Sequence, residues 1–198
     1  MQFLPLLAVE SIAWRLPVSD RSAIILARAM LDGDGPAVVA ALADTLSSDP
    51  PLTLWSLCRA AQSGIAPRAA KNLAEWLAAR VVELLASRNL STDAAPADGS
   101  LVDRYASLVE QAVLRADWAV ALASDDPSVP AEEIHLAALV HGPWAWHEAA
   151  VGDSSAGGSL PPTNLLPEIP PPIAQRLAES LARLQTAQST GSEDERLT

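Results

Sequence analysis

The spacing of apolar residues predicts helices along most of the chain. Leucine, valine and alanine recur every three or four positions, and β-branched residues do not alternate with polar ones over any convincing stretch. The pattern predicts an all-α fold in which strand signals are nearly absent. The expected helices run from Asp20 to the Gly33-Asp34-Gly35 turn, from Pro36 through Leu46, from Asp49 to Ser63-Gly64, after Pro67 through Leu85, from Ser100 through Val120, and from Pro130 to about Val140.

The helix that begins at Asp49 has the clearest start. The Asp49 carboxylate can accept the free amides of the first turn, while Pro50 lacks a donor where none is needed. Pro36 suits a first-turn position in the same way, and Asp20 is a good N-cap. These starts predict separate short helices that pack through one apolar face each.

A change of composition near the middle of the chain predicts two helical lobes. The segment 90–100 is rich in turn formers and lacks apolar periodicity, so it reads as a linker. The expected segments are an N-terminal lobe at 1–89, the linker at 90–100, a second lobe at 101–150, a Pro/Gly/Ser-rich arm at 151–172, a C-terminal helix at 173–187 and a disordered tail at 188–198.

Charge and composition exclude several classes of partner. The 198 residues carry 24 acidic and 13 basic side chains, and a net charge of −11 repels a phosphate backbone, so nucleic-acid binding is not expected. No apolar run approaches the roughly 18 residues of a membrane span, and no basic residue precedes Arg15 in the apolar N-terminus, so we expect a cytoplasmic chain without membrane contact. The single Cys58 fits a small buried residue, with a catalytic thiol as the minor alternative.

Two segments carry a recognisable order of motifs. The first contains Leu16-Pro17, Asp32-Gly33-Asp34-Gly35, Ser48-Asp49-Pro50-Pro51-Leu52-Thr53 and Ala61-Gln62-Ser63, and the second runs from Ala137 to Gly142. Together they resemble HDOD domains, the bacterial regulatory relatives of the HD phosphohydrolases, over roughly residues 14 to 148. The second segment is similar to the family's Ala-Gly-Leu-Leu-His-Asp helix end, and Gln62 stands where the family has asparagine.

The resemblance implies an HD-like bundle of two helical lobes whose metal-ligand set is incomplete. An active HD phosphohydrolase uses an upstream histidine, a His-Asp doublet and a later aspartate to hold metal and activate water. Here His141 is kept, but Gly142 replaces the aspartate, and Glu110 or Gln111 falls near the position of the upstream histidine. We therefore expect no metal, no cofactor and no enzymatic activity.

The histidines and tryptophans near this helix end are the remaining candidates. His135 and His141 are six residues apart, about 240° around a helix, so they cannot chelate one ion from a regular helix. A buried or half-buried structural role is favoured for His141, and a pair with His147 is the only candidate for residual metal binding. Trp144 and Trp146 either pack in the core or anchor a partner.

The leading hypothesis is a non-catalytic HDOD-like signalling or scaffold module that binds a protein partner in bacterial signal transduction. The expected contact surface is the groove between the lobes, with Trp55, His141, Trp144, Trp146 and His147 as candidate binding residues. Two alternatives stay open. One is a divergent metal-dependent phosphohydrolase, and the other is a sensor that binds a nucleotide in the degenerate HD cavity without turning it over.

Overall fold

The computed structural model describes residues 6–9, 14–17, 19–86, 90–91, 99–124, 130–142 and 168–179. The all-α class is confirmed for this part of the chain. Within it no helix has both the length and the apolar character needed to cross a membrane. Its eight helices are α1 (Asp20–Asp32), α2 (Pro36–Leu46), α3 (Pro50–Gln62), α4 (Ala70–Ala78), α5 (Val81–Ala86), α6 (Gly99–Ala123), α7 (Ala131–Leu139) and a helix over 171–179.

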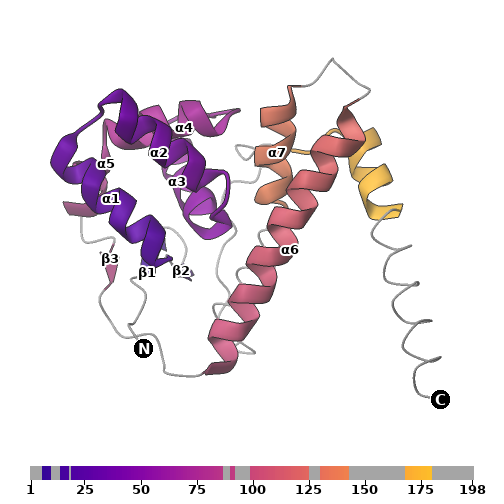
Figure 1. Ribbon diagram of the computed structural model, residues 1–198, viewed down its shortest axis with the longest axis horizontal. Coiled ribbons are helices and arrows are strands. Elements are labelled where there is room, and N and C mark those ends of the chain that lie inside the picture. Colours follow the sequence, from indigo (N-terminus) through magenta and orange to yellow (C-terminus); the bar gives the residue numbers. More distant parts are fainter. Residues whose placement is uncertain are drawn as a thin grey trace.

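The long helix α6 divides the molecule. Figure 1 shows α1 to α5 gathered on one side of α6, with α7 between α6 and that group, and the helix over 171–179 on the other side. We call the α1–α5 group the first lobe. The second lobe consists of the C-terminal half of α6, α7 and the helix over 171–179.

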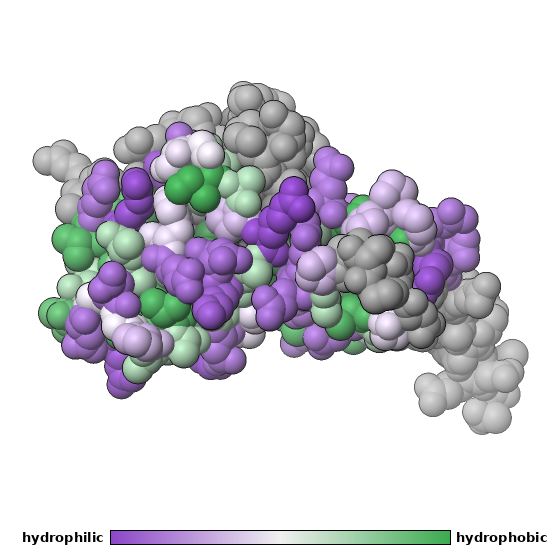
Figure 2. All heavy atoms as spheres, turned by 90° about the horizontal axis from the view of Figure 1, so that it is seen from above, coloured by the Kyte–Doolittle hydropathy of each residue, from purple (hydrophilic) through white to green (hydrophobic). Residues whose placement is uncertain are grey.

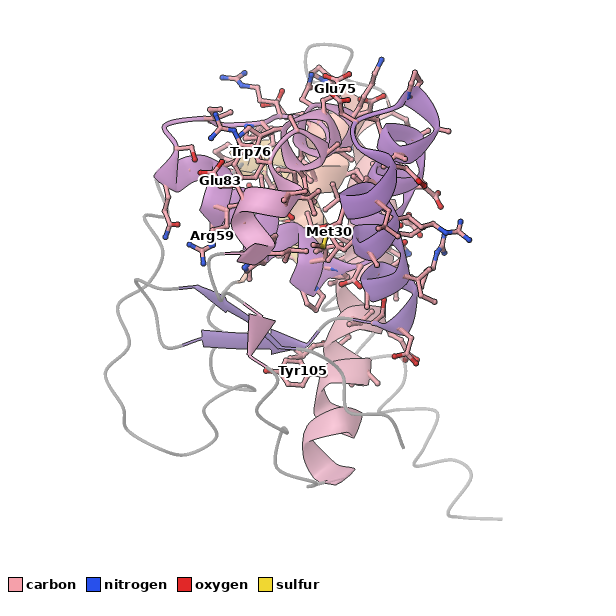
Figure 3. All side chains as sticks on the ribbon, turned by 90° about the vertical axis from the view of Figure 1, so that its left-hand side faces the viewer. Met30, Arg59, Glu75, Trp76, Glu83 and Tyr105 are labelled. Carbon is pink, nitrogen blue, oxygen red and sulfur yellow. The ribbon has the colours of Figure 1, made fainter. Side chains whose placement is uncertain are left out.

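Three short strands were not foreseen from the sequence. They are β1 (Leu6–Val9), β2 (Trp14–Pro17) and β3 (Leu90–Ser91), and they pair antiparallel in the order β2-β1-β3. Figure 3 shows them beneath the helical layer of the first lobe, where β1 and β2 contact α3. Such pairing depends on tertiary context more than on residue propensity, which is why periodicity did not reveal it.

Helix α3 is the centre of the first lobe. Its residues from Pro50 to Ala61 are all buried, so it is surrounded on every side, as a helix without a solvent face must be. Its buried hydroxyls donate to backbone carbonyls: Thr53 Oγ1 to Leu46 O and Asp49 O, and Ser56 Oγ to Leu52 O at 2.8 Å. These bonds let Thr53 and Ser56 lie in an apolar core with their hydroxyl groups satisfied.

The predicted cap at Asp49 is confirmed, and it does more than start α3. Asp49 Oδ1 accepts from the Leu52 amide at 3.0 Å, and Oδ2 accepts from the Ser19 hydroxyl at 2.9 Å and from the Ser22 hydroxyl. The N-cap of α1 is Ser19, which accepts from the Ser22 amide, and not the predicted Asp20. One buried carboxylate therefore joins the starts of α1 and α3.

Two apolar clusters fill the two lobes. Tyr105 and Ala112 of α6 belong to the cluster of the first lobe, whereas α6 from Ala116 onward belongs to the second. Ile169, together with Ile173 and Leu177 of the helix over 171–179, completes the second cluster. The division between the cores therefore falls inside α6, whereas the predicted linker at 90–100 contains β3 and the first two residues of α6. The predicted domain boundaries stay predictions.

Two predicted helices differ in extent. The helix expected after Pro67 is broken at Ala79 and Arg80 into α4 and α5, although no glycine or proline stands there. The break accompanies burial of Val81 and Leu85 in the first core, so packing overrides local helix propensity. The C-terminal helix begins at 171, two residues before the expected start. Residues 151–167 of the predicted arm and 180–198, with the predicted tail, lie outside the described residues.

Replacing Asp49 by alanine should lower the free energy of unfolding by about 2–3 kcal/mol, because the α3 cap is lost and the buried Ser22 hydroxyl loses its acceptor. Asp49→Asn keeps an acceptor for the Leu52 amide and should cost about 1 kcal/mol. Urea unfolding followed by circular dichroism measures both. An alanine variant no less stable than the asparagine variant would contradict this role.

Candidate functional site

An open pocket of about 410 Å³ lies where the first lobe meets α6 and α7. We call it the interlobe groove. Its lining consists of Ala43 and Asp44 of α2, the α2 C-cap Ser47, Ala70 and Lys71 of α4, Val120 of α6, and Ala131, Glu132 and His135 of α7. The molecule seen from above in Figure 2 shows hydrophilic residues interspersed with small apolar areas, without one continuous apolar surface.

The position of the groove follows from the packing of α7. Glu132, Leu136 and Val140 form a row at four-residue spacing along one side of this helix. Leu136 and Val140 are buried in the core of the first lobe, whereas Glu132 is exposed and lines the groove. The groove is thus the open end of the contact between α7 and the first lobe.

Both helices that begin at the groove lack a capping side chain. Neither Ala69, the N-cap of α4, nor Pro130, the N-cap of α7, makes a side-chain cap bond. Glu132 lies in the first turn of α7, where a negative charge is favourable beside the helix dipole. Beside these starts, an ion pair of 3.5 Å between Arg68 and Glu133 connects the two lobes.

His135 is the titratable group in the groove wall. It is half-buried, and its Nε2 lies 3.8 Å from Asp117 Oδ1 of α6. Burial lowers the pKa of His135, and the Asp117 carboxylate offsets part of this shift. The imidazole is therefore neutral at pH 7, and it adds no positive charge to the groove.

Full charges in the groove are mainly negative. Asp44 and Glu132 lie on walls formed by different helices, and Lys71 is the cation among the lining residues. Arg21 pairs with Asp44, but their side chains are 64% and 70% exposed, so the pair contributes little to stability. The groove therefore keeps accessible carboxylates beside Ala43, Ala70, Val120 and Ala131, the small apolar lining residues that we call its floor.

His141 lies just beyond the end of α7, in agreement with the helix end expected at about Val140. Helix α7 ends at Leu139, and the His141 side chain that follows is exposed overall, although part of it is shielded from solvent. Gly142 has φ +77°, in the left-handed region that favours glycine. Glycine therefore has a backbone role where the HD doublet has aspartate, and a side chain there would be strained.

An arginine from α6 caps the end of α7 beside His141. Arg115 Nε donates to Ala138 O at 2.8 Å, and Arg115 Nη2 donates to His141 O at 2.9 Å. Partial burial lowers the pKa of His141, and the neighbouring guanidinium lowers it further. A guanidinium this close repels a metal cation, so the chemistry around His141 opposes metal binding.

No set of three or more His, Cys, Asp or Glu side chains in the described segments is arranged to hold a metal ion. His135 lines the groove near the start of α7, whereas His141 follows its end, so the two histidines do not form one site. The proposed pair with His147 falls outside the described residues, as do Trp144 and Trp146. Their assignments stay predictions.

Trp55 does not belong to the groove. Its side chain is fully buried in α3, with the Arg59 guanidinium 5.9 Å from its ring centroid, so it is a core residue and not part of an accessible contact surface. Cys58 on the same helix is also buried, and burial raises its pKa to about 12. A thiol so strongly held in its protonated form is a poor nucleophile.

Sequence reasoning missed most residues of the groove. Ala43 and Ser47, like Ala131 and His135, are spaced four apart, which places each pair on one face of its helix. That spacing was the available signal. Small residues at such spacing also occur in ordinary helix packing, so it did not distinguish an open groove from a closed interface.

The lowered pKa values of His135 and His141 predict a measurable loss of stability in acid. Their pKa values in the folded chain lie below the ordinary 6.5, so the folded state binds protons less readily than the unfolded state. Their contribution to stability is complete above pH 6.5 and declines as the pH falls toward the lowered values. The variant His135→Gln/His141→Gln should therefore lose less unfolding free energy than the parent between about pH 7 and pH 5. Urea titrations at the two pH values measure this loss. An equal loss of unfolding free energy in the parent and in the variant would contradict the prediction.

Comparison with known proteins returned no match to a family model, a curated protein or a solved structure. The resemblance to HDOD domains stays a prediction from the residues that carry it. The residues of the interlobe groove and of the Arg115 contact are the structural observations that bear on function.

Proposed function

We propose that this chain is a non-catalytic, HDOD-like helical module that binds a protein partner in signal transduction, and that the interlobe groove is its contact surface. The observation that carries the proposal is the groove itself, an open pocket lined by four helices from two lobes. Its alanines leave space for side chains of a partner, and its charged residues stand at accessible positions. Grooves between helices are a common site for an inserted peptide or helix.

The chemistry of the groove favours a protein partner over a nucleotide. Phosphate recognition uses arginine clusters or several convergent cations, because these groups match the charge of phosphate oxygens. Here two carboxylates, Asp44 and Glu132, accompany Lys71, and Asp117 adds a third carboxylate beside His135. A phosphodiester in this position would meet repulsion from most of its charged neighbours, which also weighs against the phosphohydrolase alternative.

Filling the groove should abolish partner binding without unfolding the chain. Ala131 is exposed and lines the groove, so Ala131→Trp places a large ring in it at little cost to the core. Affinity purification from native cell extract with chemical cross-linking should recover a partner with the parent chain but not with this variant. The partner is identified by mass spectrometry, and circular dichroism checks the fold of each sample.

Ala121→Trp is the matched control for this experiment. Ala121 is exposed on α6 but does not line the groove, so the same substitution there should leave the partner bound. A partner retained by Ala131→Trp as strongly as by the parent would remove the groove from the proposal. Failure of the parent to recover any reproducible partner would contradict the proposed function as a whole.

Trp144 and Trp146 give a separate test of the sequence-based surface. We expect the double variant Trp144→Ala/Trp146→Ala to weaken partner binding while the helix content stays that of the parent, since aromatic anchors contribute strongly to interfaces. The same affinity purification, with circular dichroism, measures both effects. Unchanged binding would exclude these tryptophans and leave the groove as the contact surface.

A further inference from the structure

The carboxylates around the interlobe groove come from three different helices. Asp44 belongs to α2, Asp117 to α6 and Glu132 to α7, and all three are exposed. Lys71 is the full positive charge among the lining residues, and His135 is neutral because burial lowers its pKa. The nearby Glu133 is paired with Arg68, as Asp44 is with Arg21, so the balance is set by Asp117 and Glu132 against Lys71 and is negative.

The net charge of the whole chain acts in the same direction. A charge of −11 produces a negative field that accelerates the approach of a positively charged partner. Arg21 contacts Asp44 from an exposed position, and a surface pair of this kind is weak enough for a cation of the partner to replace it. The carboxylates around the groove can therefore pair with basic side chains at several points.

The floor of the groove imposes a second requirement. Ala43, Ala70, Ala131 and Val120 present small apolar side chains between the charged positions. Small residues on helix surfaces leave depressions into which larger apolar side chains of another helix can insert. An occupant that matches both the apolar floor and the carboxylates around it has one apolar face flanked by cations.

We propose that the occupant of the interlobe groove is a basic amphipathic helix of a partner protein, whose apolar face lies on the alanine floor and whose Lys or Arg side chains pair with Asp44, Asp117 and Glu132. This inference rests on the proposed function and specifies the chemistry of the partner. An acidic helix would instead bring its charges against these three carboxylates.

A displayed peptide library tests this chemistry directly. The library contains helix-forming peptides of about 18 residues, roughly 27 Å long, with a constant Leu/Ala face and Lys, Arg, Glu or Gln varied on the other positions. The full chain serves as bait, and peptides that also bind the groove-filled Ala131→Trp variant are removed. We expect the retained peptides to be enriched in Lys and Arg and to bind more weakly at high salt.

Charge reversal then locates the contact. Asp44→Lys/Glu132→Lys should weaken a retained basic peptide by about tenfold or more, measured by fluorescence anisotropy. Asp34→Lys/Glu179→Lys makes the same change in net charge at exposed positions outside the groove and should have a much smaller effect. A compensating peptide with Glu in place of its basic residues should regain affinity for the groove variant.

The possible outcomes separate this inference from the proposed function. Retained peptides that are neutral or acidic, no retained peptides, or equal weakening by the two double variants would overturn the basic helix. A native partner that binds the parent but not the Ala131→Trp variant would then still support the groove as a binding surface. A native partner that binds both would contradict the groove as a binding surface and the basic helix as its occupant.

Discussion

The buried carboxylate of Asp49 is the contact on which the arrangement of the first lobe depends. It caps α3 through the Leu52 amide and accepts hydroxyl hydrogen bonds from Ser19 and Ser22 at the start of α1. Helix α3 is buried on all sides, and the strands as well as the neighbouring helices pack against it. The direction of α3 therefore fixes the position of α2 and α4, which form one side of the interlobe groove.

The other side of the groove depends on how closely α6 and α7 approach. Alanines at 112, 116, 119 and 123 recur along α6, and Ala137 and Ala138 lie on α7, so the two helices meet through small side chains. Arg115 then binds the carbonyls of Ala138 and His141 at the end of α7. Packing and capping together hold α7 between two cores. Its free end at Ala131 can form a groove wall because the rest of the helix is fixed.

The sequence predicted the elements whose signals are local. Asp49-Pro50 and Pro36 marked the starts of α3 and α2, because a cap and a first-turn proline act within a few residues. The break at Ala79 and Arg80 depends on distant packing, and no local pattern encodes it. The groove was expected between the lobes, but its lining residues were not, since they come from four helices that only the fold brings together.

The architecture of the groove suits the binding role that we propose for it. Its walls are helices fixed by buried contacts, so binding does not require them to become ordered, and the conformational cost of association is low. Arg115 fills the space beside His141 with a fixed positive charge, and Gly142 gives the chain a turn in place of a carboxylate. The end of α7 where the resemblance places catalysis is thus occupied by structural contacts, whereas its other end remains open. Accessible charge and space are found together at that open end, which is the physical reason to place recognition there.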